Sequence, residues 1–353
     1  MMRTCFVHIG MHKTGSTAIQ AAFHGYNDGK IAMLDLGRPN HSWPMQAVFS
    51  SGVSRAREGL RNGVKADDID ATAASLRNSI ITQFQASTCD FIITGEGLST
   101  RLSAADIADL KVFLANWFQK VQVIIYFRDP ASFMRSAFQQ IVKGSELAFD
   151  LDLVRPNYRK RTRGWMTQFG KENVTVVLYD RKAFAKGSVV HDFAQRIGVE
   201  VSHVSHVSKN ESLHAEGLAI CYAIRNELAE GNLSLLRWAG LRADLLLAPN
   251  FGTRKFDFSE TLIAEALDKQ KEDIAWAEEM MKQPFPVRKR TTDAVEFGSH
   301  EDLLQYGRNQ MPHFDIWKRK NFSPLRRLRY LVRGVRIRLR KQLSKDAEGV
   351  LNA

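Results

Sequence analysis

Cysteine is scarce in this sequence of 353 residues, which contains only Cys5, Cys89 and Cys221. The three are widely spaced and odd in number, so they provide neither a disulfide framework nor closely spaced zinc ligands. Long apolar runs are also missing: no stretch approaches the roughly 20 apolar residues that span a bilayer. Residues 1–10 lack the apolar core and the cleavage site of a signal peptide. These absences predict a protein made and kept in the cytosol.

Acidic residues are missing from one part of the chain. Between Lys318 and Lys345 there are twelve Lys and Arg residues and no Asp or Glu. The other 38 basic residues equal the 38 acidic ones in number, so the net charge of +12 belongs to this tail. A basic surface over the whole chain, as in nucleic-acid-binding proteins, is not indicated. We therefore expect no nucleic-acid partner.

Short apolar runs alternate with helical patterns through the first 200 residues. The runs, at 4–9, 91–94, 121–127 and 174–179, do not alternate strictly between apolar and polar residues. Such runs are typical of strands buried on both faces of a parallel sheet. Helical patterns are found at 68–85, 104–118, 131–143 and 159–169. The alternation predicts a three-layer α/β/α fold with a central parallel sheet.

The strand signal fades after about residue 201. Helices are expected at 213–229 and 261–281, whereas proline, glycine and mixed charge indicate loops at 284–309. We therefore predict three consecutive segments: an α/β core at 1–200, a helical part at 201–313 and a basic tail at 314–353.

The first strand leads into a turn with the composition of a phosphate-binding loop. Residues 10–17 read GMHKTGST, and the two glycines allow sharp turns and a close approach of a ligand to the main chain. The helix that follows offers unpaired N–H groups and a positive dipole end. Capping of that helix alone is the alternative interpretation. The residues expected to bind a phosphate are Lys13, Thr14, Gly15, Ser16 and Thr17.

The position of the lysine in this turn distinguishes two kinds of loop. A Walker A loop has its lysine directly after the second glycine, but Lys13 comes two residues before Gly15. An ordinary ATP or GTP site is therefore disfavoured. The order K-T-G-S-T resembles the 5′-phosphosulfate loop of sulfotransferases that use 3′-phosphoadenosine 5′-phosphosulfate (PAPS). That resemblance implies a P-loop-NTPase-like architecture that transfers sulfuryl groups.

A second motif strengthens the resemblance. The run at 121–127 is followed by Arg128, Asp129 and Pro130, and Ser136 lies eight positions after Arg128. This resembles the 3′-phosphate motif of the same family, in which a guanidinium and a hydroxyl hold the additional phosphate. A local ion pair at the strand end is the alternative for Arg128, and a surface position is an equal alternative for Arg135.

The resemblance covers roughly residues 3–180. The sequence NESL at 210–213 also resembles a piece of bacterial members of the family.

Sulfuryl transfer needs a base for the attacking hydroxyl and positive charge at the leaving phosphate. The resemblance and the chemistry together assign the second role to Lys13. Glu96 is the first candidate for the base, because it follows the run at 91–94 between two glycines. His12, next to Lys13, is the second candidate. A solvated or capping carboxylate, and a histidine pointing away, are the alternatives.

Three other residues have weaker assignments. His24 and His41 are possible acceptor-site residues, and Ser99 either contacts the nucleotide or caps a helix.

The tail has the pattern of a basic amphipathic helix. On a helical wheel one face is apolar and the other is rich in arginine. The apolar face comprises Leu325, Leu328, Leu331, Val332, Val335, Leu339 and Leu343. Such a helix at 318–345 indicates an anionic membrane surface as partner, and a peripheral position on the inner face of the cytoplasmic membrane. A tail packed on the domain, and binding of an anionic glycan, are alternatives.

The leading hypothesis is thus a PAPS-dependent sulfotransferase without a metal, acting on a glycan or glycolipid hydroxyl. The helical part would lie on the acceptor side. One alternative is a P-loop-type kinase of a nucleotide or small molecule. The other is a noncatalytic, membrane-associated nucleotide-binding protein.

Overall fold

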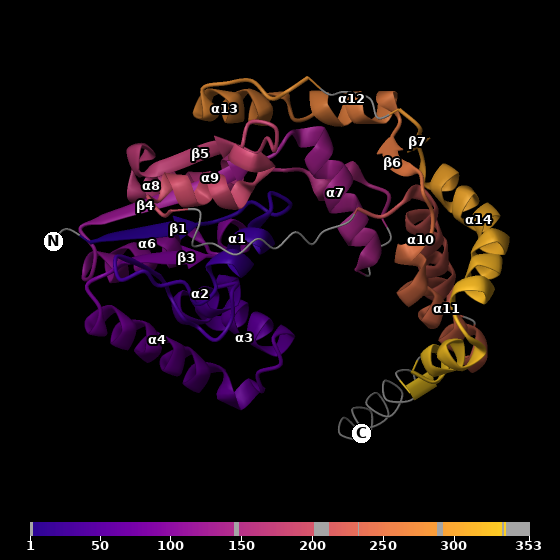
Figure 1. Cartoon of the computed structure of the whole chain (residues 1–353), viewed down its shortest axis with the longest axis horizontal. Helices are drawn as coiled ribbons and strands as arrows, with labels where there is room; N and C mark the ends of the chain where they lie inside the picture. The colour runs from indigo at the N-terminus through magenta and orange to yellow at the C-terminus, as the bar shows by residue number, and fades with distance from the viewer. Residues whose placement is uncertain are drawn as a thin grey trace. The chain divides into compact units, whose positions relative to one another are not determined.

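The structure is a computed structural model of the chain (Figure 1). It describes residues 3–144, 148–200, 212–231, 233–287, 292–333 and 335–336. The chain is divided into two units. The first unit contains Met1–Pro130, Pro156–Asn210 and Gln270–Pro286. The second contains Ala131–Arg155, Glu211–Lys269 and Val287–Ala353. The units interleave along the chain, whereas the predicted segments 1–200, 201–313 and 314–353 are consecutive.

A five-stranded parallel sheet forms the centre of the first unit, with the strand order β2-β3-β1-β4-β5. Its strands are β1 (Thr4–His8), β2 (Ile31–Met33), β3 (Asp90–Thr94), β4 (Lys120–Phe127) and β5 (Val174–Leu178). Four of them coincide with the apolar runs of the sequence. The fifth, β2, has only three residues and is too short to show a periodic pattern. In this order the carboxyl ends of β3, β1 and β4 lie side by side, at the edge where ligands bind in open α/β sheets.

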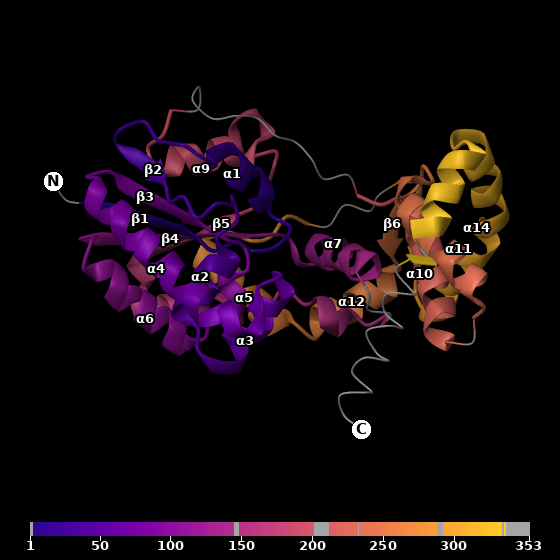
Figure 2. The same ribbon diagram turned by 90° about the horizontal axis from the view of Figure 1, so that it is seen from below.

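Helices cover both faces of this sheet (Figure 2). The helices of the first unit are α1 (Ser16–Phe23), α2 (Ser42–Phe49), α3 (Gly52–Arg61), α4 (Ile69–Ala86), α5 (Leu98–Arg101), α6 (Ala104–Ala115), α8 (Tyr158–Phe169), α9 (Val189–Arg196) and α13 (Lys271–Met281). On one face, Phe6 and Ile92 of the strands pack with Phe23 of α1 and Phe193 of α9.

On the other face, Phe91 of β3 contacts Phe84 of α4 and Phe118, which follows α6. The apolar strands are thus buried from both sides. The predicted three-layer α/β fold with a central parallel sheet is confirmed, as is the helical C-terminal part.

The second unit is mainly helical. Its helices are α7 (Pro130–Lys143, of which Pro130 belongs to the first unit), α10 (Ala215–Glu230), α11 (Leu235–Leu247), α12 (Glu260–Asp268), α14 (His300–Asn321) and a further helical stretch at 324–333. A small parallel sheet joins β6 (Lys255–Phe258) to β7 (Ala294–Phe297). Aromatic rings fill the core: Phe138 of α7 contacts Tyr222 of α10 and both Phe256 and Phe258 of β6.

The sequence misassigned two parts of this region. The loop predicted at 284–309 is wrong from Ala294 onward, where β7 and the start of α14 are found. The helix predicted at 261–281 is two helices, interrupted at Gln270, whose backbone is not helical. Four-residue strands and a break without proline or glycine leave no periodic signal in the sequence.

Within the part of the chain that the structure describes, none of the helices has the length and apolar character needed to cross a bilayer.

Replacement of Phe193 tests the packing of the first unit. Its side chain is fully buried, 5.3 Å from the Phe23 ring and 5.5 Å from the His8 ring. We expect Phe193→Ala to lower the free energy of unfolding by about 3–5 kcal/mol, since a cavity replaces the ring. Urea denaturation measures this change.

The matched control is Val112→Ala on α6, where the side chain is 68% exposed. Its expected effect is within about 0.5 kcal/mol. A loss below 1 kcal/mol for Phe193→Ala, or equal losses for both variants, would contradict this packing.

Candidate functional site

The turn between β1 and α1 folds around the carbonyl oxygen of Met11. The hydroxyls of Thr14 and Ser16 both donate to this oxygen, at 2.6 and 3.1 Å. Gly15 has a φ of 77° and directly precedes α1. In the described part of the chain, the backbone N–H groups of Gly15, Ser16 and Thr17 have no acceptor. These amides at a helix start fit an anionic oxygen, as predicted for a phosphate.

The two hydroxyls have a different role in this structure from the one expected. Thr14 and Ser16 are buried, and the hydrogen bonds of their hydroxyls to Met11 shape the turn. Their hydroxyl protons are therefore already donated within the protein. The Thr17 side chain is exposed at the start of α1. Direct phosphate contacts from these hydroxyls stay a prediction.

Arg128, at the end of β4, adjoins this turn. Its Nη1 donates a hydrogen bond to the carbonyl oxygen of Lys13 at 2.8 Å. Its guanidinium carbon lies 6.0 Å from the centre of the Tyr179 ring. The Tyr158 hydroxyl donates to the backbone oxygen of Arg128 at 2.5 Å, so the backbone and the side chain of Arg128 are both held. The two segments predicted to bind anions are therefore neighbours in one unit.

Glu96, which follows β3, also adjoins the turn. Gly10 has a φ of 109°, and a Cβ placed on it would lie 3.0 Å from the Cα of Glu96. The carboxylate accepts two hydrogen bonds, from Gln20 Nε2 at 2.5 Å and from Asn40 Nδ2 at 3.2 Å. Two amides thus fix the orientation of the carboxylate at the sheet edge.

His12 is half-buried between charged groups. Burial lowers the pKa of His12 to about 4, and the positive charges of Arg161, Arg101 and Lys13 add to the shift, while Glu96 opposes it. A lowered pKa means that the imidazole is neutral above about pH 4 and remains so at pH 7. One ring nitrogen is then able to accept a proton.

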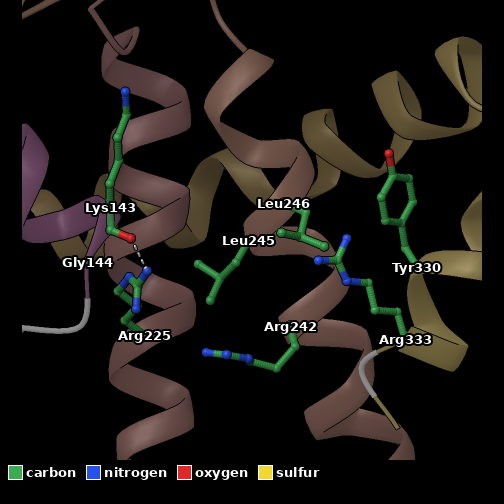
Figure 3. A pocket seen from close by; sticks show the side chains of 8 residues that line it. All are labelled: Lys143, Gly144, Arg225, Arg242, Leu245, Leu246, Tyr330 and Arg333. Atoms are coloured by element: carbon green, nitrogen blue, oxygen red, sulfur yellow. Dashed lines mark hydrogen bonds between the residues drawn. The ribbon is translucent and has the colours of Figure 1, made fainter. Parts of the chain in front are cut away.

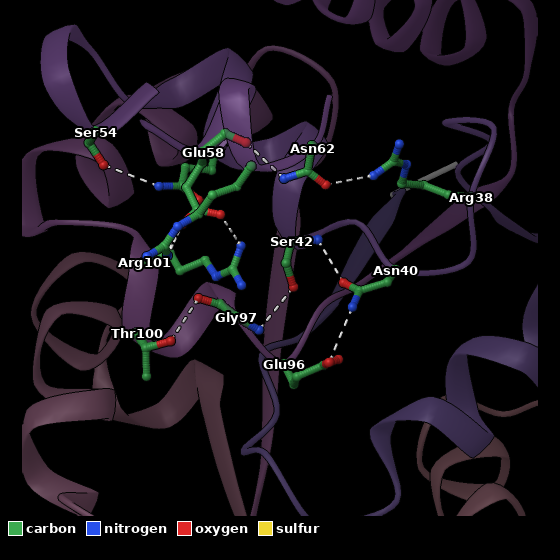
Figure 4. Close-up of polar contacts among 12 residues, drawn as sticks. Arg38, Asn40, Ser42, Ser54, Glu58, Asn62, Glu96, Gly97, Thr100 and Arg101 are labelled. Carbon is green, nitrogen blue, oxygen red and sulfur yellow. Dashed lines mark hydrogen bonds and ion pairs between the residues drawn. The ribbon is translucent and has the colours of Figure 1, made fainter. Parts of the chain in front are cut away.

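His12 and Glu96 line the same cavity of about 300 Å³ in the first unit. Figure 4 shows its polar wall, in which Glu58 accepts from Arg101 Nη1 at 2.6 Å and from Arg61 Nη1 at 2.9 Å. The other lining residues are Arg38, Asn40, Ser42, Trp43, Asn62 and Gly97. Most of these side chains hydrogen-bond, so the cavity suits a ligand with many polar groups.

Sequence reasoning missed this wall because its residues come from the loop before α2, from α2, from α3 and from the segment around α5, outside either motif. The spacing of Ser42 and Gly97 illustrates the difficulty. The Gly97 N–H donates to Ser42 Oγ at 2.9 Å, across 55 positions of the chain. No local pattern in the sequence marks such a contact.

Several predicted residues have other positions. His41 is fully buried, its Nδ1 accepts from the Thr94 N–H at 3.2 Å, and burial lowers its pKa to about 4. It therefore supports the end of β3 and is not available to an acceptor. His24 is exposed after α1. The Ser99 hydroxyl donates to the Glu96 carbonyl at 3.2 Å, and a contact with the nucleotide stays a prediction.

The remaining part of the second motif lies in the second unit. Arg135 Nη1 pairs with buried Asp257 at 3.0 Å, an interaction internal to that unit. Ser136 is on α7, and its contribution to a 3′-phosphate site stays a prediction. Of the segment at 210–213, residues 210 and 211 lie outside the described residues.

Comparisons with known proteins give limited likeness. No family model matches the chain. An uncharacterized protein of Archaeoglobus fulgidus is 26% identical over 113 residues, which are 30% of this chain and 31% of that protein. The chain thus matches about a third of the length of this curated relative.

Two solved structures are similar to the chain. A sulfotransferase from Alicyclobacillus acidocaldarius is 15% identical, with a TM-score of 0.38 over 72% of this chain and 98% of that one. The sulfotransferase domain from the curacin biosynthetic pathway is 14% identical, with a TM-score of 0.31 over 60% and 79%. At TM-scores below 0.5, neither likeness carries an argument about the activity of this chain.

A pair of glycine variants tests the contact between the turn and Glu96. Gly10 and Gly29 both have a positive φ, but only at Gly10 would a Cβ meet other atoms. Gly29→Ala should cost about 1–2 kcal/mol of stability through backbone strain alone. Gly10→Ala should cost about 1–3 kcal/mol more, through overpacking against Glu96.

Urea denaturation of both variants measures the difference. Equal losses would show that the turn does not rest against Glu96.

Proposed function

We propose that this chain is a sulfotransferase that transfers the sulfuryl group of PAPS to an acceptor hydroxyl, leaving 3′,5′-ADP. The hydrogen bond between Arg128 and the Lys13 carbonyl carries the proposal. Two segments 115 positions apart, each resembling one anion-binding motif of that family, adjoin at the sheet edge. PAPS has two anionic ends on one adenosine, and this pair of segments is suited to both.

The turn at 10–17 would hold the 5′ end. PAPS supplies the sulfuryl group when it is bound. The N–H groups of Gly15, Ser16 and Thr17 and the charge of Lys13 would stabilise the negative charge that develops on the leaving phosphate. Arg128 would hold the 3′-phosphate by charge-assisted hydrogen bonds. Since these residues supply the positive field, the proposal includes no metal.

Glu96 is the proposed base. Its carboxylate, oriented by Gln20 and Asn40, would accept the proton of the attacking hydroxyl. His12 is the second candidate, because it is neutral at pH 7 and lines the same cavity. Glu96 is the first choice because two amides fix the orientation of its carboxylate beside the turn.

The acceptor we propose is a hydroxyl of a glycan or glycolipid. The cavity beside Glu96 is lined by guanidinium, amide and hydroxyl groups, with one tryptophan, Trp43. Sugars offer many hydroxyls to such groups. The cytosolic location predicted from the cysteines, and a peripheral position through the tail, remain parts of this proposal.

Nucleotide binding distinguishes this function from a kinase. By isothermal titration calorimetry, 3′,5′-ADP should bind more tightly than ATP. Lys13→Ala and Arg128→Ala should each weaken 3′,5′-ADP binding about 10- to 100-fold, as expected for a lost charge-assisted interaction of about 1.5–3 kcal/mol.

The matched controls are Lys182→Ala and Arg181→Ala, exposed residues in the loop after β5 of the same unit. They should leave the affinity unchanged. Tighter binding of ATP than of 3′,5′-ADP would favour the kinase. Equal losses of affinity in the control variants would mean that only the net charge of the chain matters.

Removal of the base should separate catalysis from donor binding. We expect Glu96→Gln to lower sulfuryl transfer from labelled PAPS to fractionated cell-surface glycans and lipids by about 10²- to 10⁴-fold. The affinity for 3′,5′-ADP should stay unchanged, because the glutamine keeps the size of the side chain.

His12→Gln is the comparison variant and should retain more activity. If His12→Gln abolished turnover while Glu96→Gln did not, the roles of the two residues would be reversed. If nucleotide bound but neither variant changed transfer to a confirmed acceptor, the assigned base would be wrong.

A further inference from the structure

A second cavity, of about 340 Å³, lies within the second unit (Figure 3). It is bordered by the end of α7, by α10 and α11, and by the helical stretch at 324–333. Its lining residues are Lys143, Gly144, Arg225, Arg242, Leu245, Leu246, Tyr330 and Arg333. Four of the eight are basic and none is acidic.

The arginines of this cavity lack carboxylate partners within the described residues. Arg225 Nη2 donates to the Lys143 carbonyl at 2.5 Å, and its Nε is buried without a hydrogen-bond partner. Arg242 has its guanidinium carbon 5.4 Å from the Trp238 ring centre, a contact that leaves its charge uncompensated. Figure 3 shows Arg242 extending toward Arg225, while Arg333 reaches toward Leu246 from the other side.

Two neighbouring basic residues, unlike those of the cavity, have carboxylate partners. Arg237 of α11 forms a two-pronged pair with Glu227, and Lys318 of α14 pairs with Asp244 at 2.7 Å. Nearby carboxylates are therefore already used by side chains outside the cavity.

The pKa of Arg225 agrees with this excess of positive charge. Burial lowers it, and the charge of Arg242 lowers it further. Half-buried like charges without partners repel one another, and an anion between them would remove that cost.

Exposed apolar side chains lie on the elements that border the cavity. Leu246 lines it and is 46% exposed, and Leu325 and Leu328 of the stretch at 324–333 are 72% and 53% exposed. Tyr330 of the same stretch instead packs against the core of the second unit. Tyr330 thus lies on the core side of this stretch, while Leu325 and Leu328 are exposed. Exposed leucines beside basic side chains are typical of a surface that enters the headgroup region of a membrane.

We propose that this cavity binds the phosphate group of an anionic lipid headgroup, with the exposed leucines entering the adjoining acyl region. The proposal goes beyond the transfer reaction and does not depend on it. It narrows the membrane contact predicted for the tail at 318–345 to a defined site. Residues 334 and 337–345 of that tail lie outside the described residues and are not part of the site.

Vesicle binding tests the site. The full chain should co-sediment with phosphatidylcholine vesicles that contain phosphatidic acid. It should not co-sediment with vesicles of phosphatidylcholine alone. The double variant Arg242→Gln/Arg333→Gln should weaken partitioning about 10-fold or more. Arg329→Gln is the matched control, since Arg329 is exposed one turn before Arg333 but does not line the cavity.

Two further measurements distinguish binding of a lipid from binding of a soluble phosphate. Leu246→Ser and Leu325→Ser should weaken vesicle binding, while calorimetry with inorganic phosphate should give the same result for these variants as for the unchanged chain. Circular dichroism checks that each variant is folded.

Three outcomes would overturn the proposal. Equal losses for Arg329→Gln and for the double variant would mean diffuse attraction rather than a site. Inorganic phosphate binding without any vesicle binding would assign the cavity to a soluble phosphate compound. Absence of both would show that the cavity binds no phosphate.

Discussion

The hydrogen bond from Arg128 to the carbonyl oxygen of Lys13 is the interaction on which the rest of the site depends. It joins the segment after β4 to the turn after β1, so the two segments that carry the predicted motifs are neighbours. The same turn contacts Glu96 through Gly10. Three strands that are neighbours in the sheet thereby bring the turn at 10–17, a guanidinium and a carboxylate to one edge.

The order of the strands explains why this edge is available. In a parallel sheet the carboxyl ends of adjacent strands lie together, and β1 is placed between β3 and β4. The helices on both faces bury the apolar residues and leave this edge to polar side chains. The fold therefore supplies the geometry, while the chemistry comes from a few residues just after the strands.

The sequence was sufficient for the parts of the molecule that have local signals. The runs that became β1, β3, β4 and β5 are continuous and apolar, and the turn at 10–17 lies directly after the first of them. Short elements were missed, because the three or four residues of β2, β6 and β7 show no period. The wall around Glu58 was also missed, since its contacts join positions far apart in the chain.

Polar residues were the least predictable individually. His41 is of a residue type common in active sites, but it is buried and accepts a hydrogen bond from the Thr94 N–H. The hydroxyls of Thr14 and Ser16 donate to the backbone of their own turn, a contact that the sequence did not predict. A side chain's type is visible in the sequence, whereas its direction is fixed by packing.

In the proposed complex, the turn at 10–17 and Arg128 hold opposite ends of one bisphosphorylated adenosine. Calorimetry can test this by comparing the affinities of 5′-AMP and 3′,5′-ADP in the unchanged chain and in the single alanine variants of Arg128 and Lys13. We expect the 3′-phosphate to contribute about 10-fold or more in affinity, equivalent to about 1.4 kcal/mol or more. This contribution should disappear without the Arg128 side chain but survive the loss of the Lys13 side chain. If it persisted without the Arg128 side chain, Arg128 would not hold the 3′-phosphate.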